Sequence, residues 1–408
     1  MTARIKRAEK WLLEDKVSLA QLCALALICL GSFLFAVYHV EFMGKYSTQY
    51  TPDEERYINM ARRVLAGGYY SYWGYGPDAV VSPGLPIFLV GLMAIFGSGP
   101  QGIYCIQLVQ CLLLAATVLC TYLLAVQFTG RRGAGLLASL LFALNGLPYL
   151  YVFRLLTETL YCFFMMLFFV LFVHALKKGS PWLHGAAGLC FGAAVLVRPL
   201  IIIIAPFLYL PWAVSCWKDW KRLFKPVLFF AAGFVIICLP WWIRNLVSFY
   251  KAILLATQTN PIYAGLAKDV KALGLEDPGS LLGNVKLLFG LLHNDFFGTV
   301  YWLTFGKFEI IFMSDIPRAV FRIFTLFVRD ITLYLGLCGG IRAFFSQKGW
   351  GPALVFWVYF ISSFLFVPTG RYALQYLPLL AVLAVWLLGL AFKGAAARQE
   401  KEERGYAL

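Results

Sequence analysis

The chain has 408 residues, of which 61% are hydrophobic and only 13% are charged, and its mean hydropathy is +0.76. A soluble domain carries about 25% charged residues, so this composition excludes soluble globular and disordered proteins and indicates a polytopic membrane protein. The net charge of +15 would suggest a nucleic-acid partner in a soluble protein. In a membrane protein, basic residues retain loops on the cytoplasmic side, so we expect the lipid bilayer as partner and no nucleic acid.

Apolar runs predict an all-α protein with about ten membrane-spanning helices. The first run is long enough to span and has no cleavage site, which predicts an uncleaved helix. The run 84–96 has only 13 residues, fewer than the roughly 17 needed to cross, so we expect it to be interfacial or re-entrant. The ten predicted spans are 17–38, 102–128, 133–151, 153–176, 183–198, 199–214, 226–243, 320–341, 350–367 and 372–392.

The distribution of basic residues predicts which loops are cytoplasmic. Short, densely basic segments follow alternate spans, as at Arg131-Arg132, Lys177-Lys178 and 218–225. The positive-inside rule then places both termini in the cytoplasm and the loops 39–101 and 244–319 on the outer face of a plasma (inner) membrane. We expect one transmembrane domain over 1–392, a short charged cytoplasmic tail over 393–408, and an active site on the outer face.

The first outer loop contains a predicted amphipathic helix that begins near Thr51. Thr51 can cap it, Pro52 suits its first position, and Glu54 completes a capping box. Asp53 lies at the positive end of the helix dipole, where a carboxylate is held ionised. Asp53 could therefore serve as a general base or a cation ligand, or it could simply be a favourable first-turn residue. The sequence around it leaves both interpretations open.

Two further features of the outer segments each allow two interpretations. The aromatic stretch 69–75 could be a sugar-stacking surface or an ordinary membrane-interface belt. Four arginines at the outer ends of spans could bind a shared anionic ligand such as a phosphate, or could extend to lipid headgroups. As a set, they favour the shared anionic site. The four are Arg154, Arg198, Arg244 and Arg371.

Several short blocks, in this order and spacing, resemble the membrane glycosyltransferases of the glycosyltransferase-C superfamily. The branch most similar is that of protein O-mannosyltransferases and aminoarabinose lipid A transferases. Together the blocks extend over residues 50 to 380, and each is weak by itself. They are Asp53-Glu54 with Tyr57 and Tyr70; Ser82-Pro83-Gly84-Leu85-Pro86; Glu158; Leu196-Val197-Arg198-Pro199; Pro240-Trp241-Trp242-Ile243-Arg244-Asn245 with Gln258-Thr259-Asn260; and Arg371-Tyr372.

The resemblance implies a glycosyltransferase-C-like fold and an inverting enzyme. It would move a sugar from a polyprenyl-phosphate-linked donor to a hydroxyl of a glycan, lipid or protein acceptor. In that pattern Asp53 and Glu54 form the catalytic acidic pair, with Asp53 as the base and Glu54, like Glu158, positioning substrate or a cation. The arginines hold the donor phosphate, with Arg198, Arg244 and Arg371 the stronger candidates and Arg154 the weaker. Further substrate-positioning candidates are Tyr57, Tyr70, Tyr372 and Asn260.

The chain departs from this family pattern at one position, and a rival function is open. Several relatives carry an acid or Lys directly before the Pro-containing block, whereas this chain has Val81-Ser82 there and Asp78 as the nearest acid. No cofactor is implied with certainty, although a divalent cation is possible. The rival is a transporter or flippase of a lipid-linked anionic glycan, which would use the same arginines without a base. Its expected polar midplane residues and paired broken helices are scarce in these apolar spans.

Overall fold

The computed structural model describes residues 18–46, 50–215, 221–258, 260–270, 272–313, 322–347 and 349–405. Within these ranges all regular secondary structure is helical, and no strand is found. Five helices are long and apolar enough to cross a membrane: Leu19–Phe42, Pro100–Thr129, Thr157–Lys178, Lys221–Phe249 and Ile323–Phe344. Six shorter apolar helices accompany them. The chain is therefore a multi-pass integral membrane protein, as the composition predicts, while the expected number of ten spans is not established.

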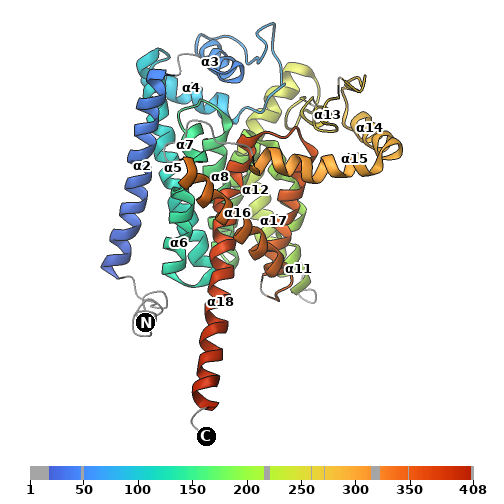
Figure 1. Cartoon of the computed structure of the whole chain (residues 1–408). Helices are drawn as coiled ribbons and strands as arrows, with labels where there is room; N and C mark the ends of the chain where they lie inside the picture. Colours follow the sequence, from blue (N-terminus) through green and yellow to red (C-terminus); the bar gives the residue numbers. More distant parts are fainter. Residues whose placement is uncertain are drawn as a thin grey trace.

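The helices form one bundle (Figure 1). They are labelled α2 to α18 in the order of the sequence. Glycine ends several of them. For example, Gly130 after α5 adopts a left-handed conformation (φ 71°) that a residue with a Cβ disfavours. The bounds are α2 Leu19–Tyr46, α3 Pro52–Leu65, α4 Gly84–Phe96, α5 Pro100–Thr129, α6 Arg132–Ala143, α7 Leu147–Tyr151, α8 Thr157–Lys178, α9 Pro181–Val197, η1 Pro199–Ile204, α10 Ala205–Leu208, α11 Leu210–Ser215, α12 Lys221–Phe249, α13 Asn260–Tyr263, α14 Leu281–Asn294, α15 Phe296–Tyr301, η3 Trp302–Gly306, η4 Glu309–Met313, α16 Arg322–Phe344, α17 Trp350–Ser362, η5 Ser363–Leu365, η6 Gly370–Gln375 and α18 Leu377–Gly405.

Small residues allow neighbouring helices such as α9 and α12 to pack closely. A Cβ on Gly188 of α9 would lie 2.1 Å from the carbonyl oxygen of Phe230 on α12, so only glycine fits there. Such close backbone approach is the usual basis of helix packing in membranes, where dispersion contacts replace the hydrophobic drive. The segment before α8, the end of α9 and η6 meet at the same end of this bundle.

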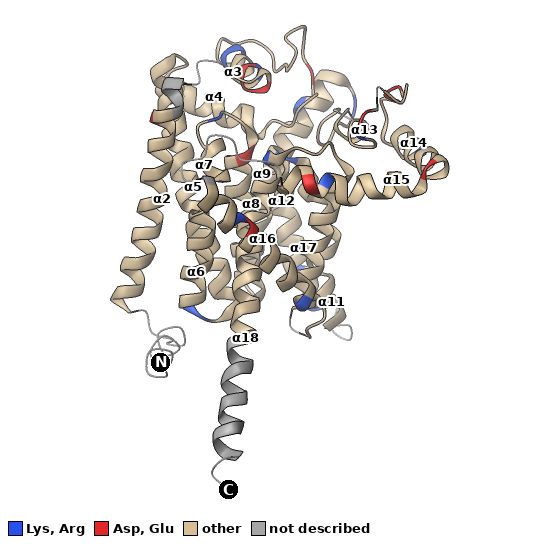
Figure 2. Cartoon of the chain, viewed as in Figure 1, with Lys and Arg blue, Asp and Glu red and all other residues tan. Residues whose placement is uncertain are grey.

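The segment from α3 to the start of α4 covers that end of the bundle. α3 lies over α4, and the loop that follows α3 rises furthest from the long helices (Figure 1). Charged residues gather around α3 and at the neighbouring helix ends, whereas the long helices are almost free of them along their length (Figure 2). The predicted capping box is confirmed: the Glu54 amide donates to Thr51 Oγ1 at 3.3 Å, and the Thr51 amide donates to Glu54 Oε2 at 2.8 Å.

A single glycine lets α4 meet the end of α9. A Cβ on Gly84 would lie 2.6 Å from the Val197 amide nitrogen and 2.7 Å from the Leu196 carbonyl oxygen. The two blocks Ser82-Pro83-Gly84 and Leu196-Val197-Arg198 are therefore in direct backbone contact. This contact fixes the position from which Arg198 extends into the bundle.

Candidate active site

Four charged side chains meet where α3, α8, α9 and η6 come together. Arg198 Nη2 lies 2.5 Å from Glu158 Oε1, and Arg371 Nε lies 3.5 Å from the same oxygen. Arg371 Nη2 in turn lies 3.5 Å from Asp53 Oδ2. The four formal charges sum to zero, and they alternate in sign along the chain of contacts. Such a network holds each side chain in place through its neighbour.

Burial differs strongly across this cluster. Asp53 keeps 40% of its side chain exposed, whereas the Glu158 side chain is 1% exposed. A buried carboxylate is costly unless it is paired, and Glu158 is paired with Arg198 and Arg371. Its second oxygen, Oε2, is buried without a hydrogen-bond partner. The cluster therefore offers one accessible carboxylate at its exposed end, which we call its mouth, and one acceptor atom at its buried end.

The two arginines of the cluster are oriented by aromatic and polar neighbours. Arg198 Nε donates to Thr157 Oγ1 at 2.8 Å, and the guanidinium lies 4.9 Å from the centre of the Tyr372 ring. Arg371 lies 5.6 Å from the same ring. Burial by itself lowers the pKa of Arg371, but the Glu158 carboxylate and the other neighbours raise it above its ordinary value. Arg371 therefore stays cationic.

Asp53 is held by a tyrosine from the aromatic stretch. The Tyr72 hydroxyl donates to Asp53 Oδ1 at 2.9 Å, and Arg56 Nη1 donates to the Tyr72 oxygen at 3.4 Å. Burial raises the pKa of Tyr72, so its phenol stays protonated and can donate. Tyr57 packs on Tyr72 with ring centres 5.8 Å apart, which makes it a neighbour of Asp53 rather than a direct contact.

Glu54 makes a separate set of contacts. Its Oε2 lies 2.9 Å from Arg154 Nη1 and also accepts from Thr51 Oγ1, and its Oε1 accepts from the Leu155 amide at 3.0 Å. The residue is 1% exposed. Glu54 and Arg154 therefore tie the start of α3 to the segment before α8. Because Asp53 and Glu54 are adjacent in sequence, this pair lies beside the Asp53 cluster, but its hydrogen bonds are separate from those of the cluster.

Arg244 is likewise engaged elsewhere. Its Nη1 donates to the carbonyl oxygen of Asp78 at 2.8 Å, and its Nη2 donates to that of Tyr70 at 3.1 Å. The Tyr70, Trp241 and Phe249 rings lie about it at 5.0–5.1 Å. Arg244 thus attaches the loop between α3 and α4 to the end of α12, and Tyr70 belongs to this attachment. The four arginines do not converge on one point, because two of them hold the loop framework.

Asp78, the acid nearest to the departure at Val81-Ser82, organises the loop 71–80. Its carboxylate accepts from the Tyr72 amide at 2.7 Å, the Ser71 hydroxyl at 2.9 Å, and the Trp73 and Val80 amides at 3.3 Å. These contacts fix the backbone that carries Tyr72 toward Asp53.

Two further substrate-positioning candidates remain, Tyr372 and Asn260. Tyr372 lies against both cluster arginines. Asn260 begins α13, but its side chain lies outside the described residues. Sequence reasoning did not single out Tyr72 or Thr157, although Tyr72 lies in the noted aromatic stretch. No group of three or more His, Cys, Asp or Glu residues suited to a metal occurs among the described residues.

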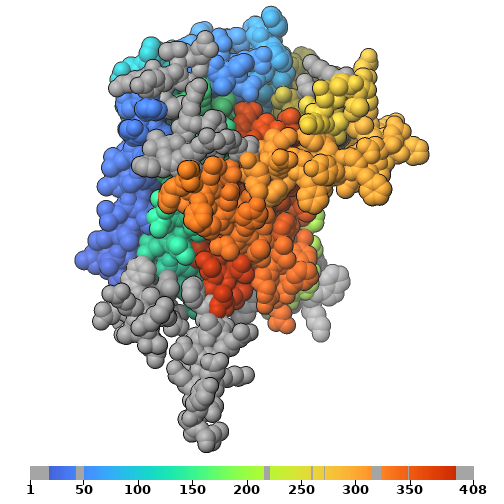
Figure 3. Space-filling model, in the orientation of Figure 1, coloured from blue at the N-terminus to red at the C-terminus, as the bar shows by residue number. Residues whose placement is uncertain are grey.

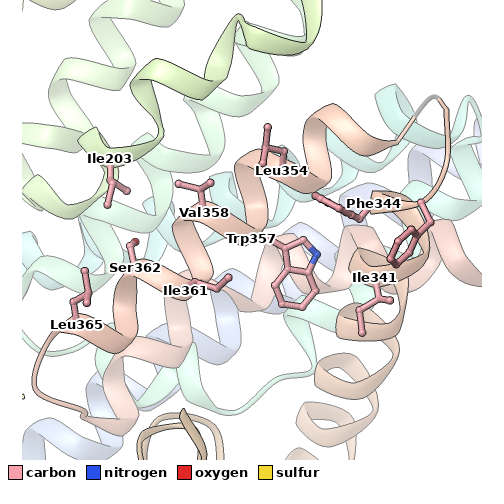
Figure 4. A pocket seen from close by; sticks show the side chains of 10 residues that line it. Ile203, Ile341, Phe344, Leu354, Trp357, Val358, Ile361, Ser362 and Leu365 are labelled. Carbon is pink, nitrogen blue, oxygen red and sulfur yellow. The ribbon is translucent and has the colours of Figure 1, made fainter. Parts of the chain in front are cut away.

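An apolar groove opens on the side of the bundle between η1, α16 and α17. It has a volume of about 620 Å³, and Figure 4 shows Trp357, Val358 and Ile361 of α17 along it. One end reaches Leu365, from which a short segment leads to η6 and Arg371. The lining is Ile203, Ile341, Phe344, Phe345, Leu354, Trp357, Val358, Ile361, Ser362 and Leu365.

A solved archaeal membrane enzyme has a similar arrangement of helices. The apo oligosaccharyltransferase of Archaeoglobus fulgidus is similar at 14% identity and a TM-score of 0.61, over 94% of this chain and 52% of that one. Its complex with an inhibitory peptide and a dolichol-phosphate is similar at 15% identity and 0.59, over 95% and 52%. ArnT from Cupriavidus metallidurans bound to undecaprenyl phosphate is similar at 13% identity and 0.46, over 93% and 80%. The chain spans about half the length of the archaeal enzyme.

A family match accompanies this likeness of fold. Residues 80–243 match the family described as dolichyl-phosphate-mannose-protein mannosyltransferase. This range contains Gly84, Glu158 and Arg198, which the structure brings together. No curated protein sequence matches the chain significantly. The chain therefore has the helical fold of the archaeal oligosaccharyltransferase, and its residues 80–243 resemble the dolichyl-phosphate-mannose-protein mannosyltransferase family.

Proposed function

We propose that the chain is an inverting glycosyltransferase that moves a sugar from a polyprenyl-phosphate donor to an acceptor hydroxyl on the outer face of the membrane. The observation that carries the proposal is the position of Asp53, an accessible carboxylate at the mouth of a cluster with two arginines. A base and a phosphate site must lie on either side of the anomeric carbon in such a reaction. Asp53 and the pair Arg198 and Arg371 provide these two functions side by side.

In the proposed step Asp53 accepts the proton of the acceptor hydroxyl. The acceptor oxygen attacks the anomeric carbon, the bond from that carbon to the phosphate oxygen breaks, and polyprenyl phosphate leaves. General base catalysis of this kind contributes roughly 10²–10⁴-fold in rate. Direct attack from the side opposite the phosphate inverts the anomeric carbon. Arginine suits the leaving phosphate, because its planar guanidinium forms paired hydrogen bonds with phosphate oxygens.

We assign the donor phosphate to Arg198 and Arg371, and we assign positioning to Arg154 and Arg244. The reason is that Arg154 is paired with Glu54, and Arg244 is bonded to loop carbonyl groups. Glu158, with its free Oε2, is suited to accept a hydrogen bond from a donor sugar hydroxyl. Glu54 then supports the site through the start of α3.

The apolar groove suits the lipid part of the donor. A polyprenyl chain gains about 25 cal/mol per Å² of apolar surface that it buries, and the groove is lined almost entirely by apolar side chains. The end of the groove at Leu365 is six residues from Arg371 in sequence. A lipid tail in the groove would therefore direct its phosphate toward the two arginines. A related fold bound to a dolichol-phosphate agrees with this choice of donor class.

The decisive variant is Asp53→Asn, because it removes the base and keeps the size of the side chain. In cells lacking the gene, mass spectrometry of glycans and polyprenyl-phosphate sugars identifies the product that the wild-type chain restores. We expect Asp53→Asn to lower this transfer by roughly 10²-fold or more while the lipid-linked donor accumulates. Glu55→Gln, an exposed acid in the same helical turn, is the matched control and should transfer normally.

The same measurement separates the enzyme from a carrier. A transporter of a lipid-linked glycan needs no base, so Asp53→Asn would leave its product unchanged. Wild-type transfer by a correctly inserted Asp53→Asn protein would overturn the proposed mechanism.

A further inference from the structure

Beside the candidate base, three aromatic side chains of the loop after α3 are held out toward solvent. Tyr69 is 41% exposed, Trp73 is 51% exposed and Tyr75 is 95% exposed. We call these three residues the aromatic platform. Large exposed aromatic rings are unfavourable in water, so a cluster of them beside a functional site indicates a surface that a ligand covers.

The platform rests on a loop that its own hydrogen bonds make rigid. The Asp78 carboxylate accepts hydrogen bonds from the Tyr72 and Trp73 amides, and the Tyr69 hydroxyl donates to the Gly74 carbonyl oxygen at 2.9 Å. The loop turns at Gly74 and Gly76, whose φ angles of 91° and 143° favour glycine. Tyr75 is thus presented at the apex of a loop whose base is fixed.

Arginine side chains lie over one face of two of the three rings. The Arg56 guanidinium lies 4.5 Å from the centre of the Trp73 ring, and that of Arg63 lies 5.7 Å from the centre of the Tyr69 ring. Arg63 Nη1 also donates to the Ser71 carbonyl oxygen at 2.8 Å. Rings that are pre-oriented in this way lose little freedom when they bind a ligand.

The position of the platform argues against a membrane-interface belt. The loop lies beyond α3 as seen from the long helices (Figure 1), and the segment from α3 to the start of α4 forms the top of the visible face in the space-filling view (Figure 3). Charged residues of α3 lie next to this loop (Figure 2). Aromatic residues of an interface belt lie level with the lipid headgroups, flanking the apolar helices.

Two contacts join the platform to Asp53. The Trp73 ring lies edge-on to Tyr72 with centres 5.2 Å apart, and the Tyr72 hydroxyl donates to the Asp53 carboxylate at 2.9 Å. A ligand stacked on the Trp73 ring would therefore place its adjacent groups near the Asp53 carboxylate. A pyranose suits this surface, because its C–H face packs on an aromatic ring while its rim of hydroxyl groups stays free to react.

We propose that the aromatic platform of Tyr69, Trp73 and Tyr75 is a saccharide-binding site that presents a sugar hydroxyl of the acceptor to Asp53. The acceptor would then be a glycan or a glycolipid headgroup, bound by stacking. Its role as acceptor site rests on the proposed function, whereas saccharide binding can be measured without turnover.

The test uses the purified full chain in lipid nanodiscs and saturation-transfer NMR with mannotriose, galactotriose and chitotriose as probes. We expect transfer to the ring C–H protons of at least one trisaccharide. Trp73→Ala and Tyr75→Ala should each weaken that signal by about fivefold, as loss of one stacking contact predicts. Trp73→Phe should retain it. Trp182→Ala, an exposed Trp at the start of α9, is the matched control and should bind like the wild type.

The outcomes separate the two proposals. Tyr75 is almost wholly exposed, so Tyr75→Ala tests the surface even if Trp73→Ala fails to fold. Equal signals from wild type and Tyr75→Ala, or no signal with any of the three sugars, would overturn the platform. Asp53→Asn keeps all three platform rings, so lost transfer with a retained trisaccharide signal concerns the base, whereas normal transfer by Asp53→Asn overturns the base and leaves saccharide binding standing.

Discussion

Arg371 Nη2 lies 3.5 Å from Asp53 Oδ2, although the two residues lie near opposite ends of the chain. The same guanidinium reaches Glu158, so one side chain links the accessible carboxylate to the buried one. In the proposed reaction the donor phosphate shares this guanidinium with the two carboxylates. Binding of the donor would then weaken the Arg371–Asp53 contact and free Asp53 for the acceptor.

Arg371→Lys tests whether the bridge needs a guanidinium. A lysine ammonium is a single compact charge and cannot span two carboxylates as the wider guanidinium does. We expect transfer to fall by about 10-fold to 100-fold, equivalent to roughly 1.4–2.7 kcal/mol. The assay is product formation in complemented membranes at matched protein levels. Arg62→Lys, whose arginine bonds the Ser98 carbonyl oxygen at 2.8 Å away from the cluster, should transfer normally.

Glu54→Gln should act on stability. The amide would turn an NH₂ group toward donors that now face a carboxylate, and it would remove the negative charge that Glu54 places against Arg154. Loss of one member of a buried pair costs about 3–5 kcal/mol, which thermal unfolding in detergent would report as a lower Tm. Arg154→Met combined with Glu54→Gln should cost less than the two single changes added together. An unchanged Tm with lost transfer would instead place Glu54 in the chemistry.

Gly84→Ala should disturb the site from a distance. The new methyl group would lie 2.6 Å from the Val197 amide nitrogen, so α4 and the end of α9 must separate, and Arg198 would shift with them. Overpacking of this kind costs about 1–3 kcal/mol. Thermal unfolding and transfer should both decline. Gly91→Ala in the same helix meets no atom within 4 Å and serves as the matched control. Equal behaviour of the two variants would contradict the close contact.

Lys307 should make stability depend on pH. It is fully buried, its Nζ donates to the Phe364 and Phe366 carbonyl oxygens, and burial lowers its pKa to about 7. The unfolded chain binds its proton up to a pKa of about 10.4, so between these values the unfolded state holds more protons. The free energy of unfolding therefore rises from about pH 7 to about pH 10 and is lowest below pH 7.

Thermal unfolding across that pH range measures this dependence. Lys307→Met should flatten the slope and raise Tm at about pH 7, since it removes the cost of burying a charge. Lys286→Met, in which an exposed lysine of α14 is changed, should keep the wild-type slope. A wild-type slope in Lys307→Met would assign the pH dependence to other groups.

The local sequence around α3 was sufficient to predict its start. Capping depends on residues three apart, so Thr51, Pro52 and Glu54 specify the helix terminus wherever the helix lies. Composition likewise determined the membrane class, because a chain with 13% charged residues cannot cover a surface in water. These properties depend on short-range geometry or on sums over the chain.

The pairing of charges was decided by tertiary structure. The four candidate arginines look alike in sequence, yet Arg198 and Arg371 meet at Glu158, Arg154 pairs with Glu54, and Arg244 holds a loop. Partners far apart in the chain are selected by how helices pack, and hydropathy carries no information on that packing. The position of Asp53 at the mouth of the cluster, and of Tyr72 against it, follows from the same long-range contacts.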